Sequence, residues 1–223
     1  MLKLQDLGGC HNINFVTPEH VVPQVALAII EARDMGLRVP IVYNTGGYDA
    51  LEAIDLMDGL VDIYLVDFKV WEEDTAARLL KARDYPTHAR EGIKAMHKQV
   101  GHLVFSEDGL AKQGVLLRHL VMPNLQQEGA RIMEYVAKDV SPDTFVSLLS
   151  QYRPTANVGK RDKTRAGERV RYAEIDRGVF LEEEVEFVRR KGIEAGLWRF
   201  DDRDLASGIV QGQMKAEPGE LAG

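Results

Sequence analysis

Short apolar runs alternate along the chain with longer segments in which apolar residues recur every three or four positions. The short runs predict five strands, over residues 13–16, 40–43, 61–68, 115–121 and 144–149. The periodic segments predict helices over residues 22–29, 49–57, 72–82, 88–100, 126–138 and 182–195. The second of these is expected to open with a capping box formed by Asp49 and Glu52. Strands that alternate with helices indicate βαβ units and a parallel sheet, so we expect an α/β fold, a barrel or part of one. An open doubly wound sheet is the alternative, although the turn after the first strand lacks Gly-x-Gly-x-x-Gly.

The remaining segments interrupt this alternation. Residues 103–114 are typical of an excursion with a turn at Asp108-Gly109. The segment from Thr155 to Arg171 is rich in lysine and arginine, which indicates a solvated or mobile loop. Residues 196–200 can add a small strand, and residues 201–223 are polar and aperiodic. We therefore expect one domain over residues 1–200 and a disordered tail over residues 201–223.

Composition narrows the class of protein. The chain has 223 residues, 45% of them hydrophobic, which suffices for one globular core. Its net charge of -7 argues against a nucleic-acid partner. No apolar run reaches the roughly 18 residues of a membrane span, and the first residues do not resemble a signal peptide. A single cysteine cannot form an internal disulfide, so a cytoplasmic location is expected.

Polar residues follow the first predicted strand, where the chemistry of parallel barrels collects. Thr17, Pro18, Glu19 and His20 stand at this strand end. The simpler interpretation is a helix start, with Thr17 as N-cap, Pro18 in the first turn and Glu19 facing the helix dipole. A helix N-terminus at a strand end is also a ready anion site.

The next strand ends carry further candidates. The turn Asn44–Gly47 would let a ligand approach the backbone closely, which is a weak signal by itself. Two-residue alternation places Asp67 and Lys69 on one face of the third predicted strand and Tyr64, Val66 and Phe68 on the other. Asp67 and Lys69 form either a structural ion pair or a functional pair. Arg118 faces the same way from the fourth strand and could clamp a carboxylate or phosphate, whereas His119 points oppositely and indicates a packed histidine.

Cys10 and His11 are adjacent near the start of the chain. A Cys–His dyad needs the two side chains close in space, and a zinc site needs three or four ligands at suitable spacing. The other histidines are scattered along the sequence. We expect Cys10 to be a small buried residue.

Several motifs, taken in order, resemble a radical S-adenosylmethionine family, the group related to pyruvate formate-lyase-activating enzymes. The resemblance covers about residues 2–200. Its motifs are LQ (4–5), GCHNIN (9–14), VTPEH (16–20), YNTGGY (43–48), VDIYLVDFK (61–69) and RHLVMP (118–123).

The resemblance implies a partial (β/α) barrel of the TIM-like type with about six units. Its first strand leads to a Cys-x-x-x-Cys-x-x-Cys loop whose thiolates hold a [4Fe-4S] cluster, and the cluster binds S-adenosylmethionine. Only five units match here, so the resemblance implies a truncated chain that is not active alone, because Cys10 cannot supply three thiolates. Val66 also departs from the family, in which proline often precedes Asp-Phe-Lys.

The resemblance further implies a set of cofactor-binding residues, matched motif by motif. They are Thr17, Glu19, His20, Asn44, Thr45, Gly46, Asp67, Lys69, Arg118, Gln151 and Tyr152. The first three match positions that bind the amino group of S-adenosylmethionine, and the next three match a cofactor-side turn. Asp67 and Lys69 match an Asp-x-Lys motif that faces cofactor or substrate, and Arg118 matches an arginine near the cofactor. The last two lie beside the adenosine side.

The implied activity is reductive cleavage of S-adenosylmethionine to a 5'-deoxyadenosyl radical. This radical takes hydrogen from a small-molecule substrate or from a glycyl-radical protein, with flavodoxin or ferredoxin as electron donor. Two other interpretations stay open: a cluster-free protein that binds a nucleotide or S-adenosylmethionine, and a barrel hydrolase or lyase that uses Asp67, Lys69 and His20. Without the first strand of the family, we also expect an unpaired sheet edge and self-association or marginal stability.

Overall fold

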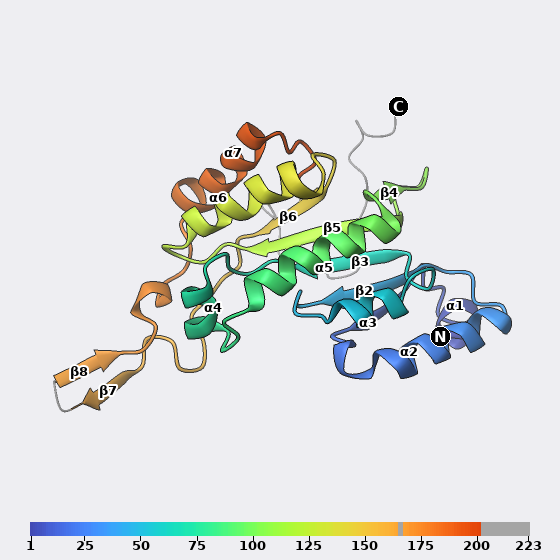
Figure 1. The fold of residues 1–223 in the computed structure, drawn as a ribbon, viewed down its shortest axis with the longest axis horizontal. Helices are drawn as coiled ribbons and strands as arrows, with labels where there is room; N and C mark the ends of the chain where they lie inside the picture. The colour runs from blue at the N-terminus through green and yellow to red at the C-terminus, as the bar shows by residue number, and fades with distance from the viewer. Residues whose placement is uncertain (165–166, 202–223) are drawn as a thin grey trace.

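A computed structural model describes residues 1–164 and 167–201 (Figure 1). The helices are α1 (Leu2–Asp6), α2 (Val22–Asp34), α3 (Leu51–Leu56), α4 (Glu73–Leu79), α5 (Tyr85–Val100), α6 (Gln126–Tyr135) and α7 (Glu186–Ala195). The strands are β1 (Ile13–Val16), β2 (Ile41–Thr45), β3 (Ile63–Asp67), β4 (Val104–Phe105), β5 (Ala111–Leu120), β6 (Phe145–Leu149), β7 (Arg161–Thr164) and β8 (Gly167–Val170). Short 3-10 or π turns span Glu19–Val21, Val136–Val140, Ala173–Ile175 and Leu181–Val185.

The five predicted strands form one mostly parallel sheet. Strands β1, β2, β3, β5 and β6 pair in that order and all run parallel, while β4 pairs antiparallel with β5. Within the described residues the sheet does not close: β1 pairs with β2 alone, and beyond β6 there is a single bridge from Val146 to Phe200. In the part of the chain that the structure describes, the fold is therefore an α/β fold with an open, mostly parallel sheet, and the expected partial barrel is not confirmed.

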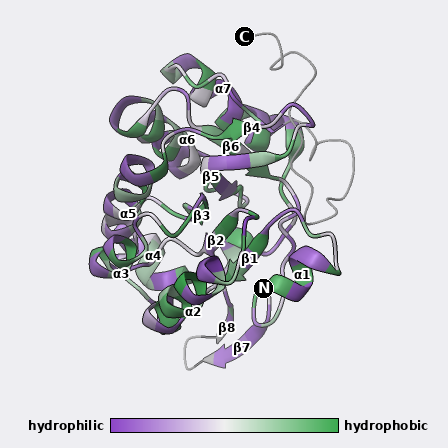
Figure 2. Ribbon diagram, turned by 90° about the vertical axis from the view of Figure 1, so that its right-hand side faces the viewer, coloured by the Kyte–Doolittle hydropathy of each residue, from purple (hydrophilic) through white to green (hydrophobic). Residues whose placement is uncertain are grey.

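The alternation of apolar side chains sorts the sheet into two faces. Tyr64, Val66 and Phe68 pack with the helices in the larger core, whereas Ile63 and Leu65 belong to a smaller cluster on the other face. Figure 2 shows the helices α2, α3, α5, α6 and α7 along one side of the sheet. Since each fully buried aliphatic or aromatic side chain contributes about 1.5–3 kcal/mol, the helix-covered face supplies most of the core. The face assignment made from the sequence is confirmed.

Two predicted helix starts are wrong. Thr17 has a left-handed φ of 54° and makes no capping bond, and α2 begins only at Val22, after the turn Glu19–Val21. The N-cap of α3 is Ala50 rather than Asp49, and no side chain caps this helix. Asp49 is instead buried and bonded to β2. A tertiary contact inside the core has displaced the local capping interaction that the sequence predicted.

The excursion after residue 103 has the expected turn. The N–H of Gly109 donates to the carbonyl oxygen of Ser106 at 2.8 Å, and Gly109 has a φ of 76°. The basic segment after Thr155, predicted to be a loop, contains the antiparallel hairpin β7–β8, which extends away from the sheet (Figure 1). Its strands pair through polar residues, for example Asp162 opposite Arg169, so no apolar alternation revealed them.

The predicted tail lies, apart from Asp201, outside the described residues. In the described part of the chain, none of the helices combines the length and the apolar character that crossing a bilayer requires.

Candidate functional site

Polar side chains from four strand ends meet at the carboxyl edge of the sheet. Because the strands are parallel, the ends of β1, β2, β3 and β5 lie along the same edge. Asp67 stands directly opposite Arg118 in the register of β3 and β5. The edge carries two groups of residues, which we describe in turn as the charged group and the acidic group.

The charged group consists of Asn44, Asp67, Lys69 and Arg118. The Nε of Arg118 donates to Asp67 at 2.7 Å, and its Nη2 donates to the side-chain oxygen of Asn44 at 2.9 Å. The Nζ of Lys69 lies 2.5 Å from the other oxygen of Asp67. Between 23% and 34% of each charged side chain is exposed, so the group faces solvent. One carboxylate is shared by two cations, which leaves one positive charge over for an anionic ligand group.

The acidic group consists of Glu19, Thr45, Asp49 and Tyr43. The Thr45 hydroxyl lies 2.7 Å from Oε1 of Glu19 and 2.5 Å from Oδ2 of Asp49. Tyr43 donates to the second oxygen of Asp49 at 2.9 Å. Oε2 of Glu19 is buried and has no hydrogen-bond partner among the described residues. A buried carboxylate oxygen without a donor is costly, so it is a natural place for a ligand donor.

Gly46 joins the two groups. Its N–H donates to Oε1 of Glu19 at 3.2 Å, and a Cβ at this position would lie 3.7 Å from Nζ of Lys69. The buried hydroxyl of Tyr85 lies 3.0 Å from the carbonyl oxygen of Gly46 and 3.1 Å from that of Asp67, and it accepts the N–H of Lys69 at 2.9 Å. Tyr85 therefore fixes the β2 and β3 ends relative to each other.

Burial sets the protonation of several groups. It raises the pKa of Asp49, against the lowering effect of the bonds to Thr45 and Tyr43. Burial also raises the pKa of Tyr85 far above its ordinary value, so this hydroxyl keeps its proton. His119 packs on the helix side as predicted, with Nδ1 2.7 Å from the carbonyl oxygen of Phe68, and burial lowers its pKa.

Of the predicted site residues, seven come together: Glu19, Asn44, Thr45, Gly46, Asp67, Lys69 and Arg118. The others stand apart. Thr17 reaches this edge through its backbone, whose N–H donates to Asn44. Within the described chain, the exposed residues His20 and Gln151 make no hydrogen bond to either group. The hydroxyl of Tyr152 donates to the carbonyl oxygen of Ile175, 23 positions later.

Three residues of this edge, Tyr43, Asp49 and Tyr85, were not predicted as site residues from the sequence, although Tyr43 lay in a predicted strand. Asp49 was interpreted as a helix cap, and Tyr85 lay just before a predicted helix with no polar pattern around it. The spacing Thr45-x-x-x-Asp49 after a strand was the one available signal for Asp49. Nothing local pointed to Tyr85, because its partners lie 16 to 39 positions away.

Cys10 does not belong to this edge. It precedes β1, at the strand's amino end, whereas Glu19 follows the carboxyl end. It is partly exposed, so the expectation of a buried cysteine is wrong. Among the described residues no group of three or more histidine, cysteine, aspartate or glutamate side chains could hold a metal ion. The residues present therefore do not fit an iron–sulfur cluster.

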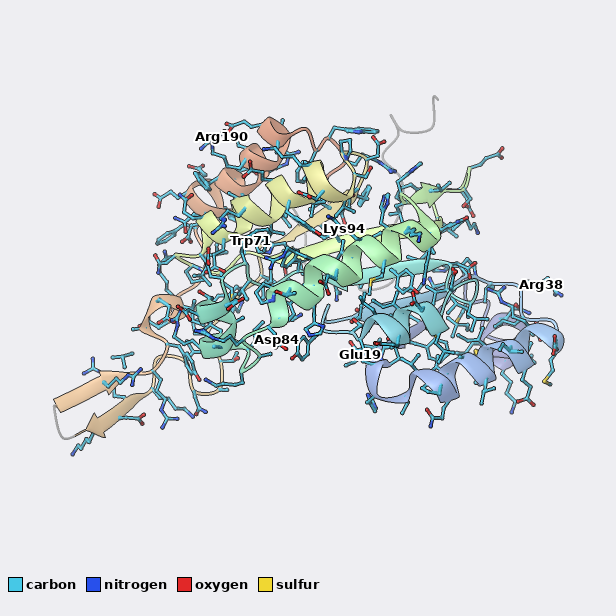
Figure 3. The ribbon with its side chains drawn as sticks, in the orientation of Figure 1. Glu19, Arg38, Trp71, Asp84, Lys94 and Arg190 are labelled. Atoms are coloured by element: carbon cyan, nitrogen blue, oxygen red, sulfur yellow. The ribbon has the colours of Figure 1, made fainter. Side chains whose placement is uncertain are left out.

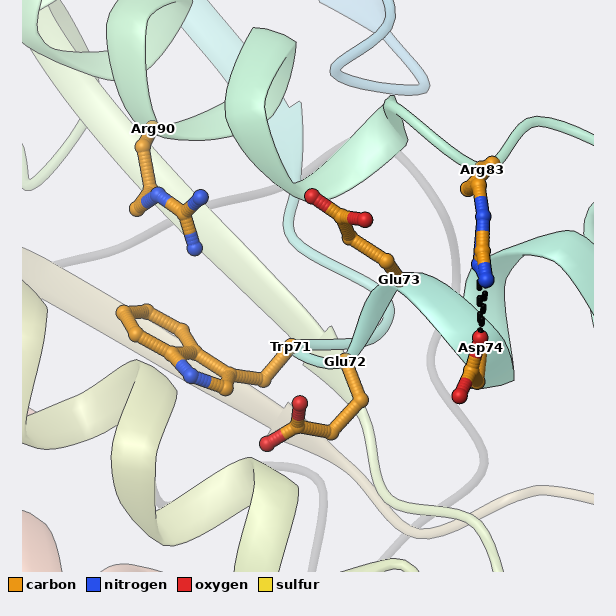
Figure 4. A pocket seen from close by; sticks show the side chains of 6 residues that line it. All are labelled: Trp71, Glu72, Glu73, Asp74, Arg83 and Arg90. Atoms are coloured by element: carbon orange, nitrogen blue, oxygen red, sulfur yellow. Dashed lines mark hydrogen bonds and ion pairs between the residues drawn. The ribbon is translucent and has the colours of Figure 1, made fainter.

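A shallow hollow of about 400 Å³ lies between the loop after β3, α4 and α5 (Figure 4). Arg83 pairs with Asp74 there, and the guanidinium of Arg90 lies 4.8 Å from the centre of the Trp71 ring. None of the described residues that line this hollow has a buried polar atom without a hydrogen-bond partner, whereas Glu19 at the carboxyl edge has one, so we place the candidate site at the carboxyl edge. In Figure 3, Glu19 at this edge and Arg38 lie at opposite ends of α2.

Comparison with known proteins identifies a relative by sequence and a solved structure with a similar fold. No model of a known protein family matches the chain. An uncharacterized protein of Methanocaldococcus jannaschii is 27% identical over 173 residues, which are 77% of this chain and 46% of that protein. The chain thus spans about half the length of this relative.

The fold is similar to that of a solved domain of a pyruvate-formate lyase-activating enzyme from Bacteroides vulgatus. The TM-score is 0.55, and the match covers 85% of this chain and 96% of the domain. At 10% sequence identity this likeness shows a shared fold and does not show a shared activity.

Proposed function

We propose that the carboxyl edge of the sheet binds S-adenosylmethionine and that the chain is the cofactor-binding part of a radical S-adenosylmethionine protein. One observation supports this most directly. A buried carboxylate oxygen of Glu19, which has no donor among the described residues, lies beside a group with one excess positive charge, with Gly46 between them. This pairing of an acceptor and a cationic group is complementary to the ammonium and carboxylate of an amino-acid moiety.

In this proposal Glu19 accepts the ammonium group of the ligand and Arg118 pairs with its carboxylate. Arg118 suits the second role because, in the part of the chain that the structure describes, its hydrogen bonds use only Nε and Nη2. Gly46 lets the ligand approach the backbone, since no side chain stands there. Asp67 and Lys69 face the remainder of the ligand or the substrate, and Gln151 and Tyr152 would lie toward the adenosine.

Radical chemistry needs a [4Fe-4S] cluster that this chain's residues do not fit, because a single cysteine cannot provide three thiolate ligands. Bound S-adenosylmethionine supplies a hydrogen-abstracting group in the family that the sequence resembles. Any such activity here, with a small molecule or a glycyl-radical protein as substrate, would depend on thiolates that these 223 residues do not contain. The same activity would also need an electron donor such as flavodoxin or ferredoxin.

A second candidate is a cluster-free protein that binds S-adenosylmethionine or another nucleotide-like ligand. The single cysteine favours it. The DNA upstream of Met1 discriminates between the two: an in-frame Cys-x-x-x-Cys-x-x-Cys supports the radical protein, and its absence supports the cluster-free one.

Isothermal titration calorimetry tests the shared part of both candidates. We expect the chain to bind S-adenosylmethionine without iron. Glu19→Gln should weaken binding about tenfold or more, because a hydrogen bond to a charged group contributes about 1.5–3 kcal/mol. Arg118→Gln should have a similar effect through the ligand carboxylate.

Glu31→Gln on the exposed face of α2 and Arg38→Gln at its far end are the matched controls. Both should leave the affinity unchanged. If Glu19→Gln and Arg118→Gln bind as tightly as these controls while folding normally by circular dichroism, the ligand does not use this edge and the proposal fails.

A further inference from the structure

The two hydrogen bonds between Thr45 and its neighbouring carboxyl groups need one more proton than is present if both carboxyl groups are ionised. The Thr45 hydroxyl lies within hydrogen-bond distance of Glu19 Oε1, at 2.7 Å, and of Asp49 Oδ2, at 2.5 Å. A hydroxyl carries one proton, so it can donate to only one of them. The second contact therefore needs a proton that belongs to a carboxyl group.

Three features assign this proton to Asp49 rather than to Glu19. Only 3% of Asp49 is exposed, whereas Glu19 is partly exposed. Oε1 of Glu19 already accepts the N–H of Gly46 at 3.2 Å, which suits an anionic acceptor. No lysine, arginine or histidine among the described residues forms an ion pair with Asp49, and an unpaired buried carboxylate is strongly disfavoured.

The groups that face Asp49 agree with this assignment. They are Tyr43 and Thr45 from β2, Glu19 from the turn before α2, Tyr64 from β3 and Tyr85 from α5. None is cationic, and Glu19 raises the pKa of Asp49 further, after the larger effect of burial. With Asp49 as donor, Thr45 accepts from Asp49 and from the N–H of Gly47, at 3.0 Å, and donates to Glu19. Every hydrogen-bonding site of the hydroxyl is then used.

We propose that Asp49 is a neutral carboxylic acid that positions the Glu19 carboxylate through the Thr45 hydroxyl, so that Oε2 of Glu19 remains the anionic acceptor for an ammonium group. The proton assignment stands on the hydrogen bonds alone, while the role toward an ammonium ligand rests on the proposed function. Asp49 is a positioning residue, because it acts on the ligand only through Thr45 and Glu19. Removing its proton would leave two carboxylates competing for one hydroxyl proton.

Asp49→Asn is the decisive variant. The asparagine amide can donate to Thr45 and accept from Tyr43, so it reproduces the hydrogen bonds of a protonated Asp49 and not those of an ionised one. Asp49→Ala removes both bonds and serves as the loss-of-contact control. We expect Asp49→Asn to bind S-adenosylmethionine within about threefold of the unaltered chain and Asp49→Ala to bind about tenfold more weakly.

Unfolding by urea tests the proton without any ligand. An acid whose pKa is raised in the folded state contributes its full stability below its unfolded pKa and loses it as the pH rises. The unaltered chain and Asp49→Asn should therefore be similar in stability near about pH 3, and the variant should be the more stable near about pH 8. If Asp49→Asn is instead less stable than the unaltered chain near about pH 8, like Asp49→Ala, then Asp49 is ionised and the inference is overturned.

Infrared spectroscopy gives a direct readout. The carbonyl stretch of a protonated carboxyl group should be present at neutral pH, shift in D2O and vanish in Asp49→Asn; its absence from the unaltered chain contradicts the assignment.

The failure of the proposed function and the failure of the proton assignment can be told apart. If S-adenosylmethionine does not bind but the unfolding and infrared results hold, only the proposed function fails. If it binds but Asp49→Asn loses stability, only the proton assignment fails.

Discussion

At the scale of single residues, the candidate site is held by groups that are far apart in the sequence. The hydroxyl of Tyr85 touches backbone groups of Gly46, Asp67 and Lys69, so one side chain of α5 fixes two strand ends. Thr45 plays a similar part between Glu19 and Asp49. These bonds are buried or partly buried, and losing one partner leaves the other unsatisfied.

Tyr85→Phe tests this anchor. Removing the hydroxyl leaves the N–H of Lys69 without its acceptor and one of the two carbonyl groups without its donor, so the free energy of unfolding should fall by about 1–3 kcal/mol. Binding of S-adenosylmethionine should weaken as well, because the Gly46 and Lys69 backbones lose their common partner. Tyr48→Phe is the control, since its hydroxyl bonds Asp84 at the surface, and it should change stability by less than about 0.5 kcal/mol. If urea unfolding shows that Tyr85→Phe and Tyr48→Phe lower the free energy of unfolding equally, Tyr85 does not anchor the strand ends.

At the scale of elements, the turn between β2 and α3 is packed tightly against the end of β3. Gly47 has a φ of 79°, and a Cβ there would lie 2.2 Å from the carbonyl oxygen of Asp67. Glycine is therefore required twice, for its backbone conformation and for the close approach of two strand ends.

Gly47→Ala and Gly59→Ala separate these two requirements. Gly59 has a similar φ of 73° but nothing within 4 Å of its Cβ position. Gly59→Ala should cost only the left-handed strain, about 1 kcal/mol, whereas Gly47→Ala should cost clearly more and also weaken ligand binding. If thermal unfolding shows equal losses for both variants, the turn is not packed against β3 as described.

Sequence patterns predicted the elements better than their ends. The two-residue alternation of β3 placed Asp67 on one face and Tyr64 on the other because burial imposes it on both sides of the sheet. The caps at Thr17 and Asp49 failed because their local signals competed with long-range bonds that no single-sequence pattern contains. The charged group was predicted from its residues, whereas its link through Tyr85 depends on a contact across 39 positions.

At the scale of the whole molecule, Glu184 joins the C-terminal segment to the loop after β5. Burial alone would raise its pKa, but hydrogen bonds from Arg177 and from the N–H groups of Asn124 and Phe180 outweigh it and lower the pKa to about 2. Only 3% of Glu184 is exposed, so its carboxylate is shielded from water, while a third of the Arg177 side chain stays accessible.

This contact predicts a specific acid sensitivity. A carboxyl group whose pKa is lowered in the folded state contributes stability above its unfolded pKa, and this stability is lost as the pH falls toward 2. Glu184→Gln should therefore cost about 3 kcal/mol near neutral pH and almost nothing near the folded pKa. Glu182→Gln, at an exposed neighbour, should show no such dependence. Urea unfolding of both variants between about pH 2 and neutral pH tests this prediction. If Glu184→Gln loses the same free energy of unfolding at every pH, the pKa of Glu184 is not lowered in the folded protein.

The open sheet also predicts self-association. Strand β1 has an unpaired edge among the described residues and carries no charge or proline that would block further pairing. We expect concentration-dependent association in sedimentation velocity, reduced by Val16→Lys in the strand. Leu27→Lys on exposed α2 should have a smaller effect if the strand edge makes the contact. A monomer at high concentration would contradict this expectation.

The central claim is that the strand ends form a ligand site, and an NMR titration with S-adenosylmethionine tests it most directly. In a 15N-labelled sample, the account predicts that the largest amide shifts fall on Gly46, Gly47 and Lys69, whose N–H groups bond within the edge. Glu31 and Arg38 should stay unchanged. Shifts that are absent, or that gather around Trp71 at the hollow of Figure 4, would contradict the account.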